Sequence, residues 1–173
     1  MTPNRTNTSN IIIRFSKIED APAIAHIYNS AIEAGGSNAY TELLPLSHFE
    51  SMIAEHKENE NPLIVAIEND ETIGLAYLSH YRCGRKALAV AAEMSFYIHP
   101  DHRRKGIAQA LIKKLESLTK ELKKTAIFGI ILDTNTASIE LMKSLGYTQW
   151  AYLPKVASFN GNLIGQVYYG KNI

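Results

Sequence analysis

The segment from residue 89 to residue 132 constrains the fold more than any other part of the chain. Residues 106–124 carry one apolar stripe and one charged face, a pattern typical of a helix that covers a sheet. The stripe consists of Ala108, Leu111, Ile112, Leu115, Leu118 and Leu122. The apolar runs on either side, 89–98 and 126–132, predict strands, and the second is apolar enough to be buried on both faces. A strand, a helix and a strand in this order form a right-handed crossover with parallel strands, so we expect an α/β protein.

The remaining patterns extend this unit to the order β-α-α-β-β-β-α-β-α-β-β, a central mixed sheet flanked by helices. Five further apolar runs predict strands at residues 11–15, 63–68, 73–80, 147–156 and 163–169. Polar tracts at 69–72 and 160–161 are suited to the hairpin turns between neighbouring strands.

Three more helices follow from their start and stop signals. The first is expected between Asp20, its start signal, and the glycines at 35–36. The second is expected to begin at Ser47, where Glu50 would complete a capping box. A short helix is expected to be capped by Asn135 and closed by a glycine at 146.

Length and charge exclude several classes of protein. The chain has 173 residues, 46% hydrophobic and 20% charged, so we expect one domain over 11–173 after a flexible polar tail at 1–10. Eighteen Lys and Arg against 17 Asp and Glu leave a net charge of +1, which attracts neither nucleic acid nor an anionic membrane. No stretch approaches the roughly 18 apolar residues of a membrane span. The single cysteine, Cys83, excludes an intrachain disulfide and favours the cytoplasm.

The strongest chemical signal is the turn between the strand at 89–98 and the amphipathic helix. It reads Arg103-Arg104-Lys105-Gly106-Ile107-Ala108. A helix N-terminus offers free N–H groups and partial positive charge, and Gly106 has no side chain to keep a phosphate away from the backbone. The patterns for nucleoside triphosphate and dinucleotide loops are absent from the sequence, so the turn is a candidate site for another phosphate-bearing ligand.

These six residues fit the signature of the GNAT superfamily of N-acetyltransferases, in which an Arg or Gln precedes a Gly by three positions and an Ala or Gly follows two positions later. The chain resembles this superfamily from Ile11 to Gly170, and within it the phosphinothricin and methionine sulfoximine acetyltransferases. That likeness lies in Ile27-Tyr28-Asn29, Thr41-Glu42, Arg85, Glu93, Phe96-Tyr97-Ile98, the six-residue turn, Asn135 and Ser138.

The resemblance implies acetyl-CoA as co-substrate and assigns residues to it. In such enzymes the six-residue turn cradles the pyrophosphate, and the preceding strand is bulged and splayed from the next, so that it pairs with pantetheine. The implied contacts are Phe96, Tyr97, Ile98, Arg103, Arg104, Lys105, Gly106, Ile107, Ala108, Gln109, Asn135 and Ser138. Asn135 has two interpretations, a helix cap and a pantetheine contact, and its amide group is able to do both.

Glu93 is the candidate base. A free alkyl amine has a pKa near ~10 and is protonated at neutral pH, so acetyl transfer benefits from a group that removes the proton. Glu93 lies among Ala91, Ala92 and Met94, where burial would raise its pKa. The alternative is an outward-facing strand residue paired with a cation. A backbone N–H near Phe96 is the expected donor to the thioester oxygen. The general acid stays open, because Met142 occupies the position where many relatives have a tyrosine.

The expected acceptor is a small amino-acid-like amine. Arg85 would pair with its carboxylate, Glu42 would receive its ammonium group, and His80 would line the pocket. The family's Phe-Arg-Thr-Glu segment reads Ala-Tyr-Thr-Glu at 39–42, and Leu88 replaces a tyrosine, so the named herbicide-like substrates are not assured. A peptide or protein N-terminus is an alternative acceptor, and a non-catalytic acyl-CoA-binding module is an alternative function.

The resemblance also implies a homodimer paired through the C-terminal half. That half supplies Trp150, Tyr152, Phe159, Tyr168 and Tyr169 as expected surface aromatics.

Other reactive side chains are given structural interpretations. His99 and His102 straddle the turn but lack an evident third ligand, so no metal is expected. Cys83 has no identifiable partner base, and the three histidines at 26, 48 and 56 are interpreted as packing or surface residues.

Overall fold

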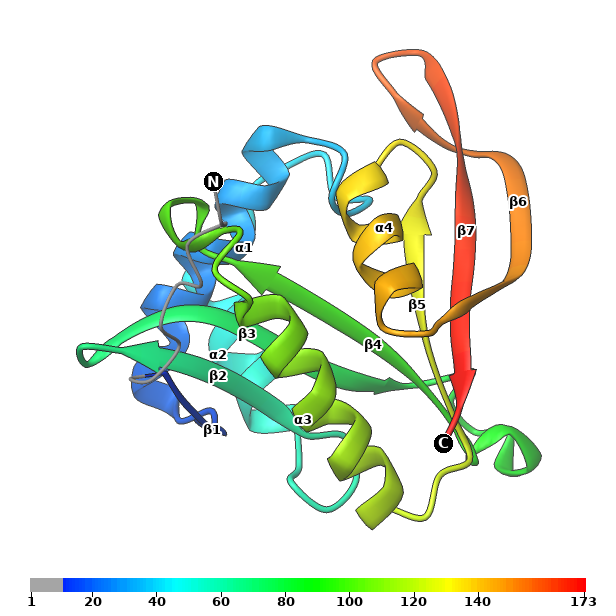
Figure 1. Ribbon diagram of the computed structural model, residues 1–173. Coiled ribbons are helices and arrows are strands. Elements are labelled where there is room, and N and C mark those ends of the chain that lie inside the picture. The colour runs from blue at the N-terminus through cyan, green and yellow to red at the C-terminus, as the bar shows by residue number, and fades with distance from the viewer. Residues whose placement is uncertain (1–10) are drawn as a thin grey trace, which may run out of the picture.

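The computed structural model describes residues 11–173, in which seven strands form one sheet of order β1-β2-β3-β4-β5-β7-β6 (Figure 1). The predicted tail at 1–10 lies outside the described residues. The strands are β1 Ile12–Phe15, β2 Leu63–Glu68, β3 Glu71–His80, β4 Ala91–Ile98, β5 Ala126–Leu132, β6 Thr148–Phe159 and β7 Asn162–Asn172. The helices are α1 Ala21–Ala34, α2 Leu46–Glu55, α3 Ile107–Glu121 and α4 Thr136–Ser144, with short 3-10 turns at 18–20, 86–88 and 100–102. The predicted element order and mixed sheet are confirmed.

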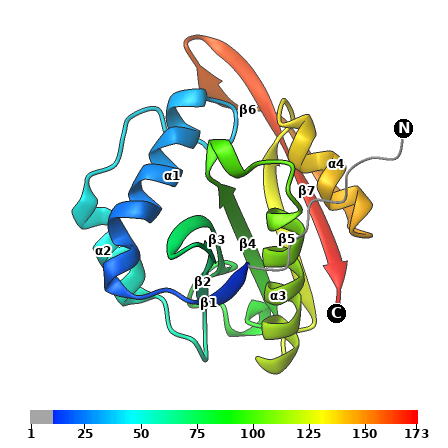
Figure 2. The same ribbon diagram turned by 60° about the vertical axis from the view of Figure 1, so that its left-hand side comes forward.

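The helices cover opposite faces of the sheet (Figure 2). α3 and α4 pack on one face, where the apolar stripe of α3 is buried against β2, β3, β4 and β5. α1 and α2 pack on the other face, with Phe49 of α2 fully buried beside Ile24 and Tyr28 of α1. The amphipathic pattern that predicted α3 therefore identified most of the residues that this helix contributes to the larger core. No helix in the described part of the chain is long and apolar enough to cross a membrane.

The parallel strands β4 and β5 separate soon after they begin. They pair over three positions, from Ala91 opposite Ala126 to Glu93 opposite Phe128. Figure 1 shows the two strands starting side by side near the C-terminus and then diverging toward α1 and α4. β3 pairs with β4 from Ala92 to Ile98 without a register shift, so the β4 bulge expected from the resemblance is not seen in that pairing. The sheet thus opens between β4 and β5, on the carboxyl side of Glu93.

The start of α1 is as expected, since the helix begins directly after Asp20, although the carboxylate is bound elsewhere and makes no cap hydrogen bond. Two other local expectations are wrong. α2 begins at Leu46 after an extended Pro45 and has no side-chain cap, because the fixed φ of Pro45 leads the chain into the helix before Ser47. Tyr169, expected at the surface, is buried in the core on the face covered by α3 and α4.

The Asp20 carboxylate joins β1, the start of α1 and β3. It accepts hydrogen bonds from both terminal nitrogens of Arg14 at 2.7 and 2.9 Å, from the Lys17 N–H at 2.7 Å and from the Thr72 hydroxyl at 3.2 Å. Burial alone would raise the pKa of Asp20, but these partners outweigh it and the pKa is lowered. The charged form of Asp20 therefore stabilises the fold.

Replacing Asp20 with Asn should lower the free energy of unfolding at neutral pH by about 1–3 kcal/mol, because the half-buried Arg14 loses its buried carboxylate partner. Since the folded pKa lies below the unfolded value of about 3.9, the stabilisation is present above that pH and is lost on acidification through the folded pKa. Urea denaturation at pH 7 and at about pH 2 should show the two proteins converging in acid. Asp101→Asn, at an exposed carboxylate, is the control. An equal loss in the control, or a difference that persists in acid, would contradict this account.

Candidate active site

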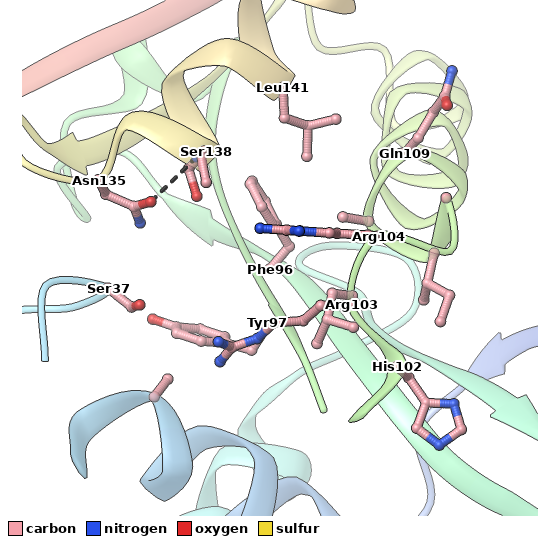
Figure 3. Close-up of a pocket in the computed structure, with 16 residues that line it drawn as sticks. Ser37, Phe96, Tyr97, His102, Arg103, Arg104, Gln109, Asn135, Ser138 and Leu141 are labelled. Atoms are coloured by element: carbon pink, nitrogen blue, oxygen red, sulfur yellow. Dashed lines mark hydrogen bonds between the residues drawn. The ribbon is translucent and has the colours of Figure 1, made fainter. Parts of the chain in front are cut away.

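A cavity of about 530 Å³ occupies the opening of the sheet (Figure 3). It lies between the end of β4, the first turn of α3 and the first half of α4. All residues predicted to contact acetyl-CoA line it except Lys105, namely Phe96, Tyr97, Ile98, Arg103, Arg104, Gly106, Ile107, Ala108, Gln109, Asn135 and Ser138. The residues that the sequence assigned to one ligand come from three separate elements, and the fold places them around one cavity.

The backbone of the turn before α3 is suited to binding an anion. Gly106 is the N-cap with φ of 80°, a left-handed conformation that glycine adopts without strain, and Arg104 before it has φ of 61°. The Ala110 N–H donates to the Gly106 carbonyl oxygen at 3.0 Å, so the three N–H groups at 107–109 precede the first intrahelical bond. They are available to a ligand.

The charge of the cavity lining is positive. Arg103 and Arg104 line it, and no aspartate or glutamate does. Figure 3 shows Arg104 extended across the opening beside Phe96, whereas the imidazole of His102 points away from the centre. Lys105 does not line the cavity; its Nζ lies 3.4 Å from Nδ1 of His102. The site therefore suits the phosphates of a nucleotide.

The opposite wall of the cavity is the first turn of α4. The Asn135 side-chain oxygen accepts a hydrogen bond from the Ser138 N–H at 3.2 Å, which confirms the predicted helix cap. The amide nitrogen of Asn135 has no part in this bond, so the second interpretation, a contact to pantetheine, stays a prediction. Across the opening, the edge of β4 beyond Glu93 has no β5 partner in the described sheet, and its backbone groups are available for hydrogen bonds to a ligand.

Glu93 stands where β4 and β5 separate. It lies opposite Ser79 of β3 and Phe128 of β5, on the sheet face that also carries Tyr77 and Tyr168. Burial raises the pKa of Glu93, and no nearby cation opposes the shift. None of the ion pairs in the described residues involves Glu93. The alternative of a strand residue paired with a cation is therefore not supported.

The three residues expected to contact the acceptor lie apart from the cavity. His80 is at the end of β3, with its Nε2 3.3 Å from the Glu60 carboxylate. Arg85 is exposed in the connection between β3 and β4, ahead of the first residue of β4. Glu42 is exposed in the α1–α2 loop. Their roles stay predictions, since none of them lines either cavity described in this section.

Several lining residues had no signal in the sequence. Ala31 and Ser37 come from the end of α1 and the loop after it, and Ala137 and Leu141 come from α4. Their residue types are common in any core or loop. Met142, which occupies the usual tyrosine position, is fully buried in the core and supplies no acid.

A second cavity of about 230 Å³ lies under α2, lined by Tyr28, Tyr40, His48, Ser51, Met52, Glu55, His56 and Tyr77. The sequence did not predict it, because its residues come from α1, α2, β3 and a loop. We call it the α2 cavity. No group of three or more metal-ligating side chains is found among residues 11–173, and the rings of His99 and His102 lie edge to face with centroids 5.5 Å apart.

The cation-lined cavity, the glycine at the start of α3 and the open edge of β4 together suit an anionic nucleotide, and the half-buried Glu93 lies where β4 and β5 separate. The sequence profile of the acetyltransferase (GNAT) family matches residues 22–147, which is more than half of the chain. The chain therefore belongs to the acetyltransferase (GNAT) family and is an acetyl-CoA-dependent N-acyltransferase.

Individual relatives agree with this assignment. The chain is 28% identical over 146 residues to the L-amino acid N-acyltransferase MnaT of Escherichia coli, covering 84% of each protein. It is 28% identical over 157 residues to phosphinothricin N-acetyltransferase of Alcaligenes faecalis, covering 90% of this chain and 79% of the relative. The structure of YncA from Salmonella typhimurium with its cofactor acetyl-CoA superposes with a TM-score of 0.89 at 27% identity, covering 95% of this chain and 94% of that one.

Arg104→Ala should weaken acetyl-CoA binding by at least about tenfold, because a hydrogen bond to a charged group contributes about 1.5–3 kcal/mol. Lys105→Ala, at the neighbouring cation that does not line the cavity, should change the affinity by less than about threefold. Isothermal titration with acetyl-CoA measures both. Equal losses in the two variants would mean that the turn acts through its overall charge and not through the contact made by Arg104.

Proposed function

We propose that the protein transfers the acetyl group of acetyl-CoA to the primary amine of a small amino-acid-like molecule. The observation that carries this proposal is the position of Glu93, a half-buried carboxylate at the last pair before β4 and β5 separate. The named activities of the relatives from Escherichia coli and Alcaligenes faecalis, both on amino-acid-like amines, support the acceptor class.

The chain's own groups have distinct tasks in this proposal. Bound acetyl-CoA supplies an acetyl group activated as a thioester. Arg103, Arg104 and the N-terminus of α3 hold its phosphates, and the unpaired edge of β4 holds its amide-bearing arm. A backbone N–H near Phe96 donates to the carbonyl oxygen as it becomes negative. Glu93 accepts a proton from the acceptor ammonium, directly or through a water molecule, so that the amine becomes nucleophilic. The amine nitrogen then bonds to the acetyl carbon, the carbon–sulfur bond breaks, and CoA leaves as a thiolate that takes a proton from solvent.

The second candidate acceptor is a peptide or protein N-terminus. A ribosomal-protein-alanine N-acetyltransferase from Brucella melitensis superposes with a TM-score of 0.89 at 25% identity, covering 94% of this chain and 99% of that one. The same Glu93 would act on either amine. A panel of free amino acids and short peptides, assayed for thiol release, separates the two. The non-catalytic alternative is not retained, because the chain belongs to an acetyltransferase family.

Glu93→Gln should lower kcat by about 10²-fold or more, with little effect on acetyl-CoA affinity, since the variant keeps the shape but loses the base. Because burial raises the pKa of Glu93, the acid limb of the wild-type rate profile should lie above the pH at which an ordinary glutamate titrates. The rate should fall as the pH falls through that raised pKa, and this limb should disappear in the variant. Glu140→Gln, at an exposed glutamate of α4, is the control. Unchanged turnover by Glu93→Gln would refute the assignment of the base.

We also propose that two copies of the chain pair through β6, in the cytoplasm, where the exposed thiol of Cys83 would stay reduced. β6 is an edge strand, and Trp150, Tyr152 and Val156 on it are about half exposed, as is Leu163 at the start of β7. An exposed, apolar edge strand is a template for pairing with a second chain. The pairing through the C-terminal half implied by the resemblance would cover this edge.

A Val156→Lys/Leu163→Lys double variant should convert a dimer to a monomer, because lysine on an edge strand opposes pairing. Sedimentation velocity measures the change. Ile12→Lys, at an equally exposed apolar residue on the opposite edge strand β1, should leave the dimer intact. A wild-type protein that sediments as a monomer would remove the proposal.

A further inference from the structure

The α2 cavity adjoins both Glu93 and the CoA cavity. Tyr77 lines it, and Tyr77 stands opposite Ser95 in the β3–β4 pairing, which makes it a diagonal neighbour of Glu93 on the same face. Tyr28 also lines it and packs against Tyr97 of the CoA cavity, with ring centroids 4.4 Å apart. Tyr77 and Tyr28 therefore place the α2 cavity next to Glu93 on one side and next to Tyr97 of the CoA cavity on the other.

Its size suits part of a small molecule. A volume of about 230 Å³ lies below the roughly 300–1,000 Å³ typical of pockets for whole drug-sized ligands. The α2 cavity lies on the same sheet face as Glu93, so an acceptor whose amine is next to Glu93 can extend its side chain past Tyr77 toward it. The cavity is thus placed to bind the acceptor's side chain.

The charge of the lining indicates which side chains would bind. Glu55, on the last turn of α2, is its one carboxylate, and no lysine or arginine lines it. Burial lowers the pKa of His56, so this imidazole is uncharged at neutral pH. Three tyrosines, at 28, 40 and 77, line the cavity, and the faces of such rings attract cations. An anionic side chain would be repelled by the Glu55 carboxylate, and no lysine or arginine of the lining would offset this repulsion.

We propose that the α2 cavity is the acceptor side-chain site and that it selects side chains ending in an ammonium or guanidinium group. The inference rests on the proposed function, since it requires the acceptor amine to lie beside Glu93. In this proposal the cationic end of the acceptor lies close to the Glu55 carboxylate and to the lining rings of Tyr40 and Tyr77. Amino acids with acidic side chains are excluded by charge, and neutral ones are accepted less well.

L-arginine and L-citrulline test this selection directly, because they have nearly the same shape and differ in the charge of the side-chain end. Each carries one amine that can be acetylated. We expect kcat/KM for L-arginine to exceed that for L-citrulline by about tenfold, from a cation–π contact and an ion pair with Glu55. L-glutamate should be the poorest acceptor of the three.

Two variants locate the selection in the α2 cavity. Glu55→Gln should reduce the arginine-to-citrulline ratio of kcat/KM by about three- to fivefold, the value of a partly exposed ion pair. Glu50→Gln, which removes an exposed carboxylate from the same helix outside the cavity, should leave that ratio within about twofold. Tyr40→Arg, at a residue that is 44% exposed, should raise the ratio of L-glutamate to L-citrulline.

The outcomes distinguish this inference from the proposed function. Turnover of amino acids with an arginine-to-citrulline ratio near one, or a ratio that Glu55→Gln does not change, overturns the side-chain site and leaves the amino-acid acceptor in place. No turnover of any free amino acid, with acetyl-CoA still bound in a titration, overturns the proposed acceptor class and this inference together. A ratio that falls in Glu55→Gln and not in Glu50→Gln supports the site.

Discussion

The separation of β4 from β5 is the constraint on which the whole site depends. Backbone N–H and C=O groups in a sheet interior need partners, because leaving such a group unpaired away from water costs about 1–3 kcal/mol. After Glu93, the inner edge of β4 has no β5 partner, and the cavity between β4 and α4 exposes that edge to a ligand. A ligand rich in amide groups can supply the hydrogen-bond partners that β5 does not provide to β4. The same separation leaves Glu93 at the vertex, beside the place where such a ligand ends.

The two ends of β4 lie in different electrostatic environments, one for each substrate. Around its carboxyl end are Arg103, Arg104 and the N-terminus of α3, without a carboxylate in the cavity lining. Near its start lies Glu93, half buried and without a cation to hold it in the charged form. An anion-binding turn close to Glu93 would stabilise the carboxylate and lower its basicity. The length of β4 keeps the two environments distinct, so that one strand serves an anionic cofactor and a cationic amine.

The sequence was most informative where one element determines the outcome by itself. The bounds of β5, the buried stripe of α3 and the cap at Asn135 follow from residues close together in the chain, and all three are confirmed. The cap at Ser47 failed because Pro45, two residues earlier, set the entry into α2. The α2 cavity could not be predicted, since Tyr40 and Tyr77 approach each other only after α1, α2 and β3 have packed. Residue types that are ordinary for packing gave no signal of a cavity.

The contact between Tyr28 and Tyr97 has a consequence for the order of events. Because these rings pack between the CoA cavity and the α2 cavity, an acceptor bound in the α2 cavity as proposed would not compete with acetyl-CoA for space. Both can be present at once, with the acetyl donor and the amine meeting at the vertex of the sheet. Such an arrangement favours direct transfer within a ternary complex over a ping-pong cycle through an acetylated side chain. In kinetic terms, a ternary complex implies intersecting double-reciprocal plots, not parallel ones.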